Sequence, residues 1–173
     1  IKVEGDSGTI TALVFGGGYD PDKDDHALGT DDDVGRAIYV VNAETGELIW
    51  GYQYVPHDPW DLDAVSPPIL AEVQGANGGM VPGVIHGGKT GWVYVHDAES
   101  GKLLRRSENM IPHENLFTPP TEEGIRMLPG ANGGVEWSPG AFNPDTRMVY
   151  YVNLHQPMTY TVEKEEWEPP SGD

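Results

Sequence analysis

The sequence contains no cysteine, and this absence removes two common ways of stabilising or equipping a protein. Without thiols the chain forms neither a disulfide nor a thiolate metal site, so cysteine usage points to no particular redox compartment. It also lacks any apolar run near the ~20 residues of a membrane-spanning helix. The opening residues, IKVE, do not resemble the apolar core of a signal peptide, so we expect a mature soluble piece, or a truncated one.

Basic residues are scarce as well. The 173 residues include 10 Lys and Arg against 28 Asp and Glu, which gives a formal net charge of −18. A surface this acidic repels phosphate backbones and anionic lipid surfaces, so nucleic acid is not an expected partner. The charge fits cation binding, a salty habitat or simple solubility.

Part of the acidity lies in a loop at residues 19–35, where Asp20, Asp22 and Asp24 alternate with other residues. Carboxylates spaced in this way are typical ligands of Ca²⁺, but the loop lacks the glycine, the final glutamate and the helical flanks of an EF-hand. It is interpreted either as a surface Ca²⁺ site or as a solvated charged loop. Residues 159–173 are predicted to form a polar tail.

Long helices are not expected, because 23 Gly and 15 Pro interrupt the chain. Its length suits one domain with a sizeable core. Residues 36–50 (RAIYVVNAETGELIW) and 91–105 (GWVYVHDAESGKLLR) form an internal repeat with a spacing near 55 residues. Each copy consists of a β-rich run, a glycine-containing turn and a second short apolar run, which predicts a β-hairpin. Residues 141–152 are a weaker third copy.

Repeated hairpins joined by Gly/Pro-rich loops predict an all-β fold of β-propeller blades rather than a sandwich. Trp50, at the end of the first copy, is expected to be buried where one blade docks on the next, and Arg105 stands at the equivalent position. We therefore expect residues 36–50 and 91–105 to form equivalent strand pairs in adjacent four-stranded blades.

The segment VPHDPWDLD at residues 55–63 is the main candidate for chemistry. An ionised carboxylate at Asp61 can act as a general base that accepts a proton, and Asp63 points the same way in an extended loop. Alternatively, Asp58 and Asp61 only form a turn by accepting hydrogen bonds from local amides. Among the six histidines, His57 alone is predicted to lie near this site.

Lys89 follows Asp63 by 26 residues, within GVIHGGKT at residues 83–90, which matches the phosphate-loop pattern. That motif requires a helix to begin at the lysine. Here β-branched and aromatic residues follow instead, so a nucleotide site is not favoured. Lys89 is either a cofactor-binding lysine or an exposed hairpin lysine. If it binds a cofactor, its ammonium should project toward the same end of the blades as Asp61.

Together these motifs are similar to the quinoprotein glucose and alcohol dehydrogenases. The resemblance covers roughly residues 13–158 and rests on the turn sequence ending at Trp50, the WDLD loop, the lysine motif, GGVEW at 133–137 and NPDT at 143–146. It implies an eight-bladed propeller, of which residues 1–173 supply about three or four blades. The remaining blades, or another subunit, are then needed to close the ring.

The same resemblance implies pyrroloquinoline quinone (PQQ) and Ca²⁺ or a lanthanide as cofactors, a small alcohol or sugar as substrate, and a cytochrome c or ubiquinone as electron acceptor in the periplasm. In these roles Asp61 is the general base and a metal ligand, Asp63 is a second metal ligand that accompanies a lanthanide, and Lys89 binds the quinone oxygens. Trp137 is implied at the rim of the cofactor pocket, although an aromatic residue after a glycine-rich turn is equally typical of a core.

The chain departs from the family near Gly17, where the metal-ligand Asn is expected, and the family's metal-binding Glu lies outside this sequence. The alternative function is a non-catalytic, calcium-binding propeller for binding or assembly. FGGGYD at residues 15–20 is similar to the propellers of type IV pilus-tip adhesins, which carry no quinone. Gly17 and the incomplete ring favour this alternative, whereas Asp61, Asp63 and Lys89 together oppose it.

Overall fold

The computed structural model describes residues 1–5, 8–17 and 37–164, and every regular element within these ranges is a β-strand. The all-β prediction is therefore confirmed. The acidic loop at 19–35 and residues 165–173 of the predicted tail lie outside the described residues. The described part of the chain forms no helix that could cross a membrane.

Twelve strands form two four-stranded antiparallel sheets and two short ladders. The first sheet consists of β1 (Lys2–Gly5), β2 (Gly8–Gly16), β3 (Ala37–Asn42) and β4 (Leu48–Gln53), paired in chain order. The second consists of β5 (Ile69–Gln74), β6 (Met80–Gly87), β7 (Val93–Asp97) and β8 (Leu103–Arg106), again in chain order. The ladders pair β9 (Ile125–Met127) with β12 (Met158–Tyr160), and β10 (Ala141–Asn143) with β11 (Met148–Tyr150).

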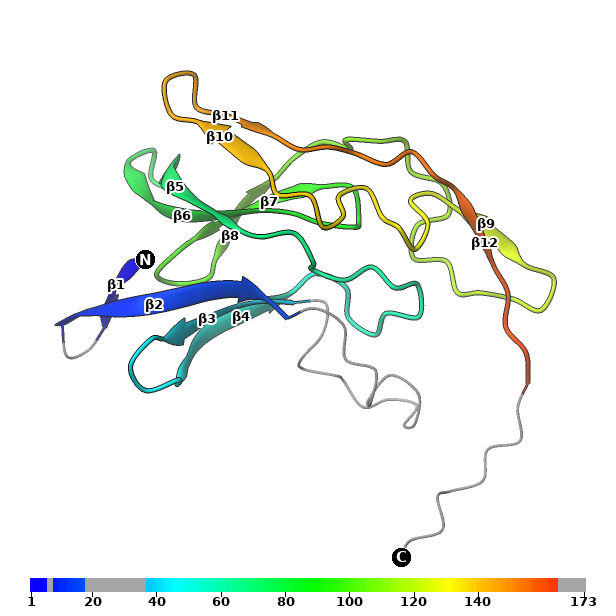
Figure 1. The fold of residues 1–173 in the computed structure, drawn as a ribbon, viewed down its shortest axis with the longest axis horizontal. Coiled ribbons are helices and arrows are strands. Elements are labelled where there is room, and N and C mark those ends of the chain that lie inside the picture. Colours follow the sequence, from blue (N-terminus) through cyan, green and yellow to red (C-terminus); the bar gives the residue numbers. More distant parts are fainter. Residues whose placement is uncertain (6–7, 18–36, 165–173) are drawn as a thin grey trace, which may run out of the picture.

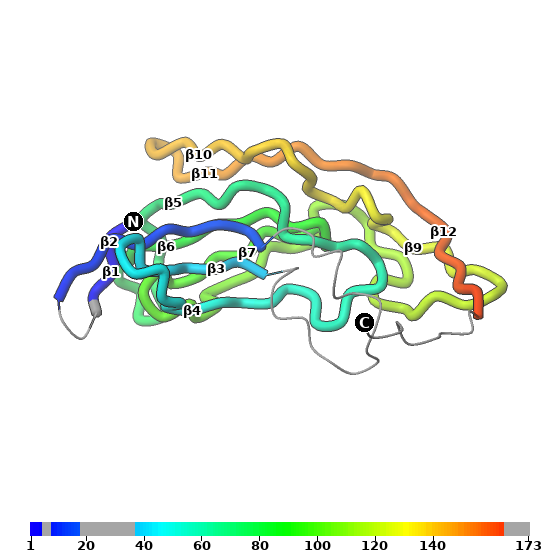
Figure 2. The backbone as a smooth tube through the Cα atoms, turned by 60° about the horizontal axis from the view of Figure 1, so that its bottom comes forward, coloured from blue at the N-terminus to red at the C-terminus, as the bar shows by residue number. Residues whose placement is uncertain are grey.

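The sheets are stacked like successive blades. The β10–β11 ladder lies on one side of the second sheet, and the first sheet lies on the other (Figure 1; Figure 2). Arg147 joins the ladder to β5, because its Nη2 donates a hydrogen bond of 2.9 Å to the carbonyl of Glu72. Whether the whole chain amounts to three or four blades stays a prediction.

The two clear repeat copies form equivalent hairpins, β3–β4 and β7–β8, as predicted. Both carry a register shift at the same place, after Val40 and after Val95. Their turns share one chemistry: a side-chain oxygen of Asn42 or Asp97 accepts hydrogen bonds from the amides two and three residues ahead. Four residues beyond each of these caps, a glycine takes a positive φ, 76° and 71° respectively.

The third copy has the same kind of turn, between β10 and β11. Asn143 accepts hydrogen bonds of 2.9 and 3.1 Å from the amides of Asp145 and Thr146. The position that glycine fills in the other two copies is occupied here by Arg147, which has a φ of 56°. A non-glycine residue is uncommon in this region of φ, so the third turn carries backbone strain that the first two avoid.

Trp50 docks the first sheet on the second, as predicted. Its indole Nε1 donates a hydrogen bond of 2.9 Å to the carbonyl of Ala98, and only 8% of the residue is exposed. The ring packs on Gly101, where an added Cβ would lie 2.7 Å from Trp50 Cδ2. Gly101 is thus required both by its positive φ and by the close approach of the indole.

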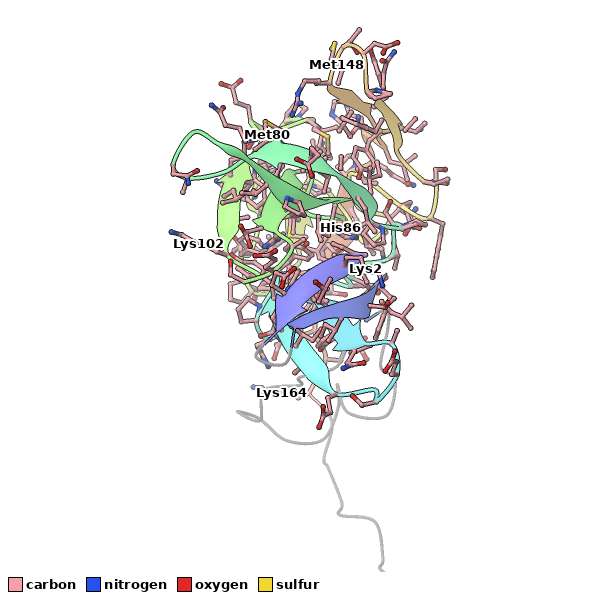
Figure 3. The ribbon with its side chains drawn as sticks, turned by 90° about the vertical axis from the view of Figure 1, so that its left-hand side faces the viewer. Lys2, Met80, His86, Lys102, Met148 and Lys164 are labelled. Atoms are coloured by element: carbon pink, nitrogen blue, oxygen red, sulfur yellow. The ribbon has the colours of Figure 1, made fainter. Side chains whose placement is uncertain are left out.

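Aromatic and imidazole rings extend this contact, and we call Trp50, Tyr52, Tyr54, His86 and His96 the aromatic joint. His96 stacks on Trp50 with ring centroids 5.9 Å apart, and Tyr54 stacks on His86 at 5.2 Å with nearly parallel planes. Figure 3 places His86 in the interior of the stacked sheets, with Lys102 and Met148 at the periphery. Burial lowers the pKa of His86 to about 4 and also lowers that of His96, so both rings are neutral at pH 7.

Candidate functional site

The loop after β4 positions the predicted carboxylates. Asp58 accepts hydrogen bonds from the amides of Trp60 (2.9 Å) and Leu62 (2.6 Å), so this residue is the turn-former. Trp60 and Leu62 are buried, and Asp61 between them has a φ of 65°. The positive φ turns Asp61 out of the packed face of the loop and toward Lys89 rather than toward local amides. The turn-forming interpretation is therefore correct for Asp58 and wrong for Asp61.

Lys89 lies in the turn between β6 and β7, with only 4% of its surface exposed. Its Nζ donates hydrogen bonds to the backbone carbonyl of Asp61 (2.9 Å) and to Asp63 Oδ2 (3.1 Å), and it lies 3.4 Å from Asp61 Oδ2. The prediction that Lys89 and Asp61 point to the same end of the blades is confirmed. The exposed-hairpin alternative is wrong, because the lysine is buried against carboxylates.

Lys89 lies within a hydrogen-bonded turn, closed by the bond from the Gly91 amide to the Gly88 carbonyl, where a phosphate loop would begin a helix. The next segment is strand β7. Thr90 is buried, and its Oγ1 lies 2.8 Å from the hydroxyl of Tyr94. The helix that the phosphate-loop motif requires at this point is therefore replaced by a turn and a strand.

A third carboxylate, Glu136, was not predicted to belong to this site. Its Oε1 lies 3.4 Å from Lys89 Nζ. The chain crosses the lysine turn just before this residue: the Gly134 amide donates to the Lys89 carbonyl at 2.7 Å, and an added Cβ on Gly133 would clash with Lys89. The two glycines therefore allow the close crossing that delivers Glu136. The glycine pair was the signal in the sequence that could have revealed it.

We call Asp61, Asp63, Lys89 and Glu136 the lysine cluster. Burial by itself lowers the pKa of Lys89, but the negative charges of Asp63, Asp61 and Glu136 outweigh burial and raise it. Burial and the neighbouring charge of Asp63 raise the pKa of Asp61, and Lys89 only partly opposes them. Asp61 also remains accessible, with 49% of its side chain exposed against 7% for Asp63. The cluster presents a charged lysine and one solvent-facing carboxylate with a raised pKa.

Trp137 follows Glu136 directly and is 70% exposed. The interpretation of Trp137 as a core residue is therefore wrong. Its amide donates a hydrogen bond of 3.1 Å to Glu136 Oε2, so the same carboxylate contacts the lysine and holds the tryptophan backbone. Trp137 thus exposes its indole one residue from the carboxylate that contacts Lys89, and an exposed aromatic ring is a surface on which a flat ligand can stack.

The segment around Gly17 runs past the carboxylate loop, since an added Cβ on the preceding Gly16 would overlap the carbonyl of Ala64, the neighbour of Asp63. Gly17 itself donates its amide to the Ala37 carbonyl at 2.8 Å. Having no side chain, it offers no oxygen at the place where the resemblance expects a metal ligand. His57, also predicted near the site, is an exposed loop residue beside Asp58.

The fit to a metal ion is partial. In residues 1–5, 8–17 and 37–164, no group of three or more His, Cys, Asp or Glu side chains could hold one. Asp61 and Asp63 do converge, because both reach Lys89 Nζ. Since Ca²⁺ takes six to eight oxygen ligands, an ion bound to these two carboxylates needs further oxygens from a cofactor or from other parts of the protein. For a planar quinone, the described residues offer a charged donor at Lys89 and an exposed ring at Trp137.

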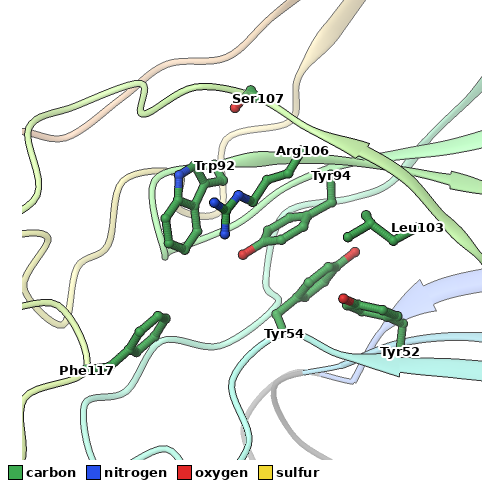
Figure 4. A pocket seen from close by; sticks show the side chains of 8 residues that line it. All are labelled: Tyr52, Tyr54, Trp92, Tyr94, Leu103, Arg106, Ser107 and Phe117. Atoms are coloured by element: carbon green, nitrogen blue, oxygen red, sulfur yellow. The ribbon is translucent and has the colours of Figure 1, made fainter.

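An open cavity of about 430 Å³, which the sequence did not predict, lies among residues of β4, β7, β8 and the loops that follow β4 and β8 (Figure 4). Its lining residues are mostly aromatic: Tyr52, Tyr54, Trp92, Tyr94, Leu103, Arg106, Ser107 and Phe117. Arg106 lies over the Trp92 ring at 3.9 Å. Two of the lining rings contact sequence neighbours of the lysine cluster: Tyr94 contacts Thr90, which follows Lys89, and Phe117 packs edge-on at 5.7 Å against Trp60, which precedes Asp61.

Comparisons with known proteins all match this chain to dehydrogenases. The family described as the β-propeller domain of glucose/ethanol/alcohol dehydrogenases matches residues 20–112 and 102–171, in agreement with the predicted propeller fold. The quinoprotein glucose dehydrogenase of Escherichia coli is 26% identical over 193 residues, covering 82% of this chain and 23% of the relative. The lanthanide-dependent methanol dehydrogenase of Methylacidiphilum fumariolicum is 28% identical over 148 residues, covering 76% of this chain and 24% of the relative.

Among solved structures, a quinohemoprotein alcohol dehydrogenase from Pseudomonas putida superimposes with a TM-score of 0.67 at 28% identity. That match covers 75% of this chain and 21% of the solved chain. The sequence therefore spans less than a quarter of the length of each of these three relatives.

Proposed function

The chain belongs to the β-propeller family of PQQ-dependent glucose, ethanol and alcohol dehydrogenases, and from this premise we propose that it forms active-site blades of an enzyme that oxidises an alcohol or an aldose sugar. The observation that carries the proposal is the convergence of Asp61 and Asp63 on the buried ammonium of Lys89. An accessible carboxylate can act as the general base toward a substrate hydroxyl, and a fixed cation beside it can stabilise negative charge that develops in the reaction.

In this proposal PQQ, when bound, supplies the electrophilic quinone that accepts the hydride. Lys89 would hold PQQ by donating a hydrogen bond to the quinone oxygens, and the exposed indole of Trp137 would supply a stacking surface. Asp61 accepts the proton of the substrate hydroxyl. Its raised pKa brings the carboxylate closer to the operating pH, which favours a general base.

The proposed metal is Ca²⁺ or a lanthanide, bound by Asp61 and Asp63 together with oxygens that the described residues do not supply. The similarity to a lanthanide-dependent methanol dehydrogenase supports a lanthanide as one of the two candidate metals, for which Asp63 is the proposed second ligand. The remaining blades, or another subunit, would complete the ring around the cofactor. We further propose a periplasmic location and electron transfer to a cytochrome c or to ubiquinone.

A non-catalytic binding or assembly propeller remains the alternative, and Gly17 is the observation that favours it. The two functions are separated by mixing the purified protein with PQQ and either Ca²⁺ or La³⁺. Perturbed PQQ absorbance, followed by turnover of alcohols or aldoses with an artificial electron acceptor, supports the dehydrogenase. Unchanged PQQ absorbance and no turnover with either metal would instead support the non-catalytic binding or assembly propeller.

A further inference from the structure

The ammonium of Lys89 has three N–H donors, and two of them are firmly placed. One lies 2.9 Å from the backbone carbonyl of Asp61, and another lies 3.1 Å from the buried Asp63 Oδ2. The third direction is shared by two longer contacts, both 3.4 Å, to Asp61 Oδ2 and to Glu136 Oε1. A ligand oxygen that approaches Lys89 therefore competes for the donor that Glu136 shares.

Glu136 is held in place for this contact. Its other oxygen accepts the amide of Trp137 at 3.1 Å, and 20% of its side chain is exposed. The preceding backbone is fixed on the lysine turn by the bond from Gly134 to the Lys89 carbonyl. A carboxylate fixed at both ends in this way does not simply swing into solvent when a ligand arrives.

Glu136 also sets the charge of the site. Three carboxylates around one ammonium leave a formal charge of −2 at the lysine cluster. PQQ is itself a polycarboxylate anion, so the cluster without a cation repels the ligand that Lys89 is proposed to bind. A divalent cation at Asp61 and Asp63 would cancel this surplus.

We propose that Glu136 is a positioning residue that shares the third donor of Lys89 with Asp61 and makes PQQ binding dependent on a cation. The inference rests on the proposed function and assigns Glu136 a role beyond it. Replacing the carboxylate by an amide keeps an oxygen for the Trp137 amide but removes one negative charge. Glu136→Gln should therefore bind PQQ more tightly than the wild type when cations are absent. At saturating cation concentration the two proteins should bind PQQ with nearly the same affinity.

The test is an equilibrium titration of PQQ into the complete protein, followed by absorbance and tryptophan fluorescence, once with EDTA and once with saturating Ca²⁺. Glu136→Gln should lower the dissociation constant in EDTA by about tenfold. With Ca²⁺ the change should stay under about threefold. Glu99→Gln, an exposed substitution in the β7–β8 turn with the same change of net charge, should leave both values unchanged. Glu136→Ala serves as a second variant and should show the same gain in EDTA.

The outcomes separate the two claims. If the wild type binds PQQ under neither condition, the proposed function fails and the inference fails with it. If the wild type binds PQQ but both Glu136 variants keep its ratio of dissociation constants in EDTA and Ca²⁺, only the inference is overturned. An equal gain in Glu99→Gln would also overturn it, since net charge alone would then explain the result.

Discussion

The aromatic joint and the lysine cluster both lie where the first and second sheets meet, and both bury ionisable side chains, yet they hold them in opposite charge states. His86 is fully buried and neutral, with a pKa lowered to about 4. Lys89 is almost as buried but has a raised pKa. The difference lies in the partners: His86 Nε2 meets the carbonyl of Ser66 at 2.8 Å, whereas Lys89 meets three carboxylates. Burial alone does not decide charge.

The comparison also separates structural from functional demands. In the joint, Trp50, Gly101 and the imidazoles fit one another closely, and the positive φ falls on a glycine. In the cluster the positive φ falls on Asp61, and negative charge is in surplus. Local strain and unbalanced charge that persist in a folded protein are typical of functional sites. We therefore expect substitutions in the joint to reduce stability, and substitutions in the cluster to reduce cofactor binding or turnover.

The largest effect is expected from Asp61→Asn, which should lower turnover by about 10² to 10⁴. Asparagine has nearly the same shape but cannot accept the hydroxyl proton, so the fold should be kept. Because the charge that favours a cation is also lost, rates must be measured at saturating metal and PQQ. Unchanged turnover of the loaded variant would remove Asp61 from the mechanism.

Substitutions in the aromatic joint should instead lower the stability of the fold. Trp50→Ala removes a buried indole and its hydrogen bond to Ala98, so the free energy of unfolding should fall by about 3–5 kcal/mol. Denaturant titration measures this directly. If Trp50→Ala unfolds like the wild type, the joint does not hold the two sheets together and the comparison fails.

Acid should weaken the joint through His86. The folded pKa of about 4 lies below the ordinary value of 6.5, so the unfolded chain binds the proton more readily. The stabilisation that comes from keeping His86 neutral is therefore complete above pH 6.5 and is lost as the pH falls toward 4, by about 3 kcal/mol at most. His86→Phe should flatten this part of the curve of unfolding free energy against pH, and the exposed His155→Gln should not. Parallel curves for wild type and His86→Phe would contradict the assignment.

Trp137→Ala is expected to have the smallest effect on the fold. The indole is 70% exposed, so the free energy of unfolding should change by no more than about 0.5 kcal/mol. If the indole covers PQQ, the dissociation constant of the cofactor should rise by about tenfold, the usual worth of an aromatic stacking contact. A large loss of stability would place Trp137 with the joint rather than with the cluster.

Sequence patterns predicted the features that depend on local chemistry. The hairpins follow from a side-chain cap and a glycine at a fixed offset, repeated at Asn42 and Asp97, and the burial of Trp50 follows from its place at the end of the first copy. The prediction that Lys89 lies near Asp61 was based on the family resemblance and not on the spacing of the two residues in the sequence.

Features that depend on distant crossings were not predicted. Glu136 reaches Lys89 only because a glycine pair more than 40 residues later in the chain passes over the lysine turn. The different roles of Asp58 and Asp61 depend on a positive φ that neither residue type reveals. The sequence shows His86 and His96 only as scattered histidines. Their role could not be predicted because His86 stacks on Tyr54 and His96 stacks on Trp50, and these contacts form only when the two sheets pack together.

If the charge of Lys89 binds the cofactor, a PQQ titration of the complete protein carrying Lys89→Arg or Lys89→Met at saturating Ca²⁺ will show it directly. We expect Lys89→Arg, which keeps the charge, to bind PQQ within about tenfold of the wild type, and Lys89→Met to bind it at least about 100-fold more weakly. Because Lys89→Met leaves the buried Asp63 without its cation, unfolding curves must first show that the variant is folded. A folded Lys89→Met protein that binds PQQ as tightly as the wild type would contradict the account.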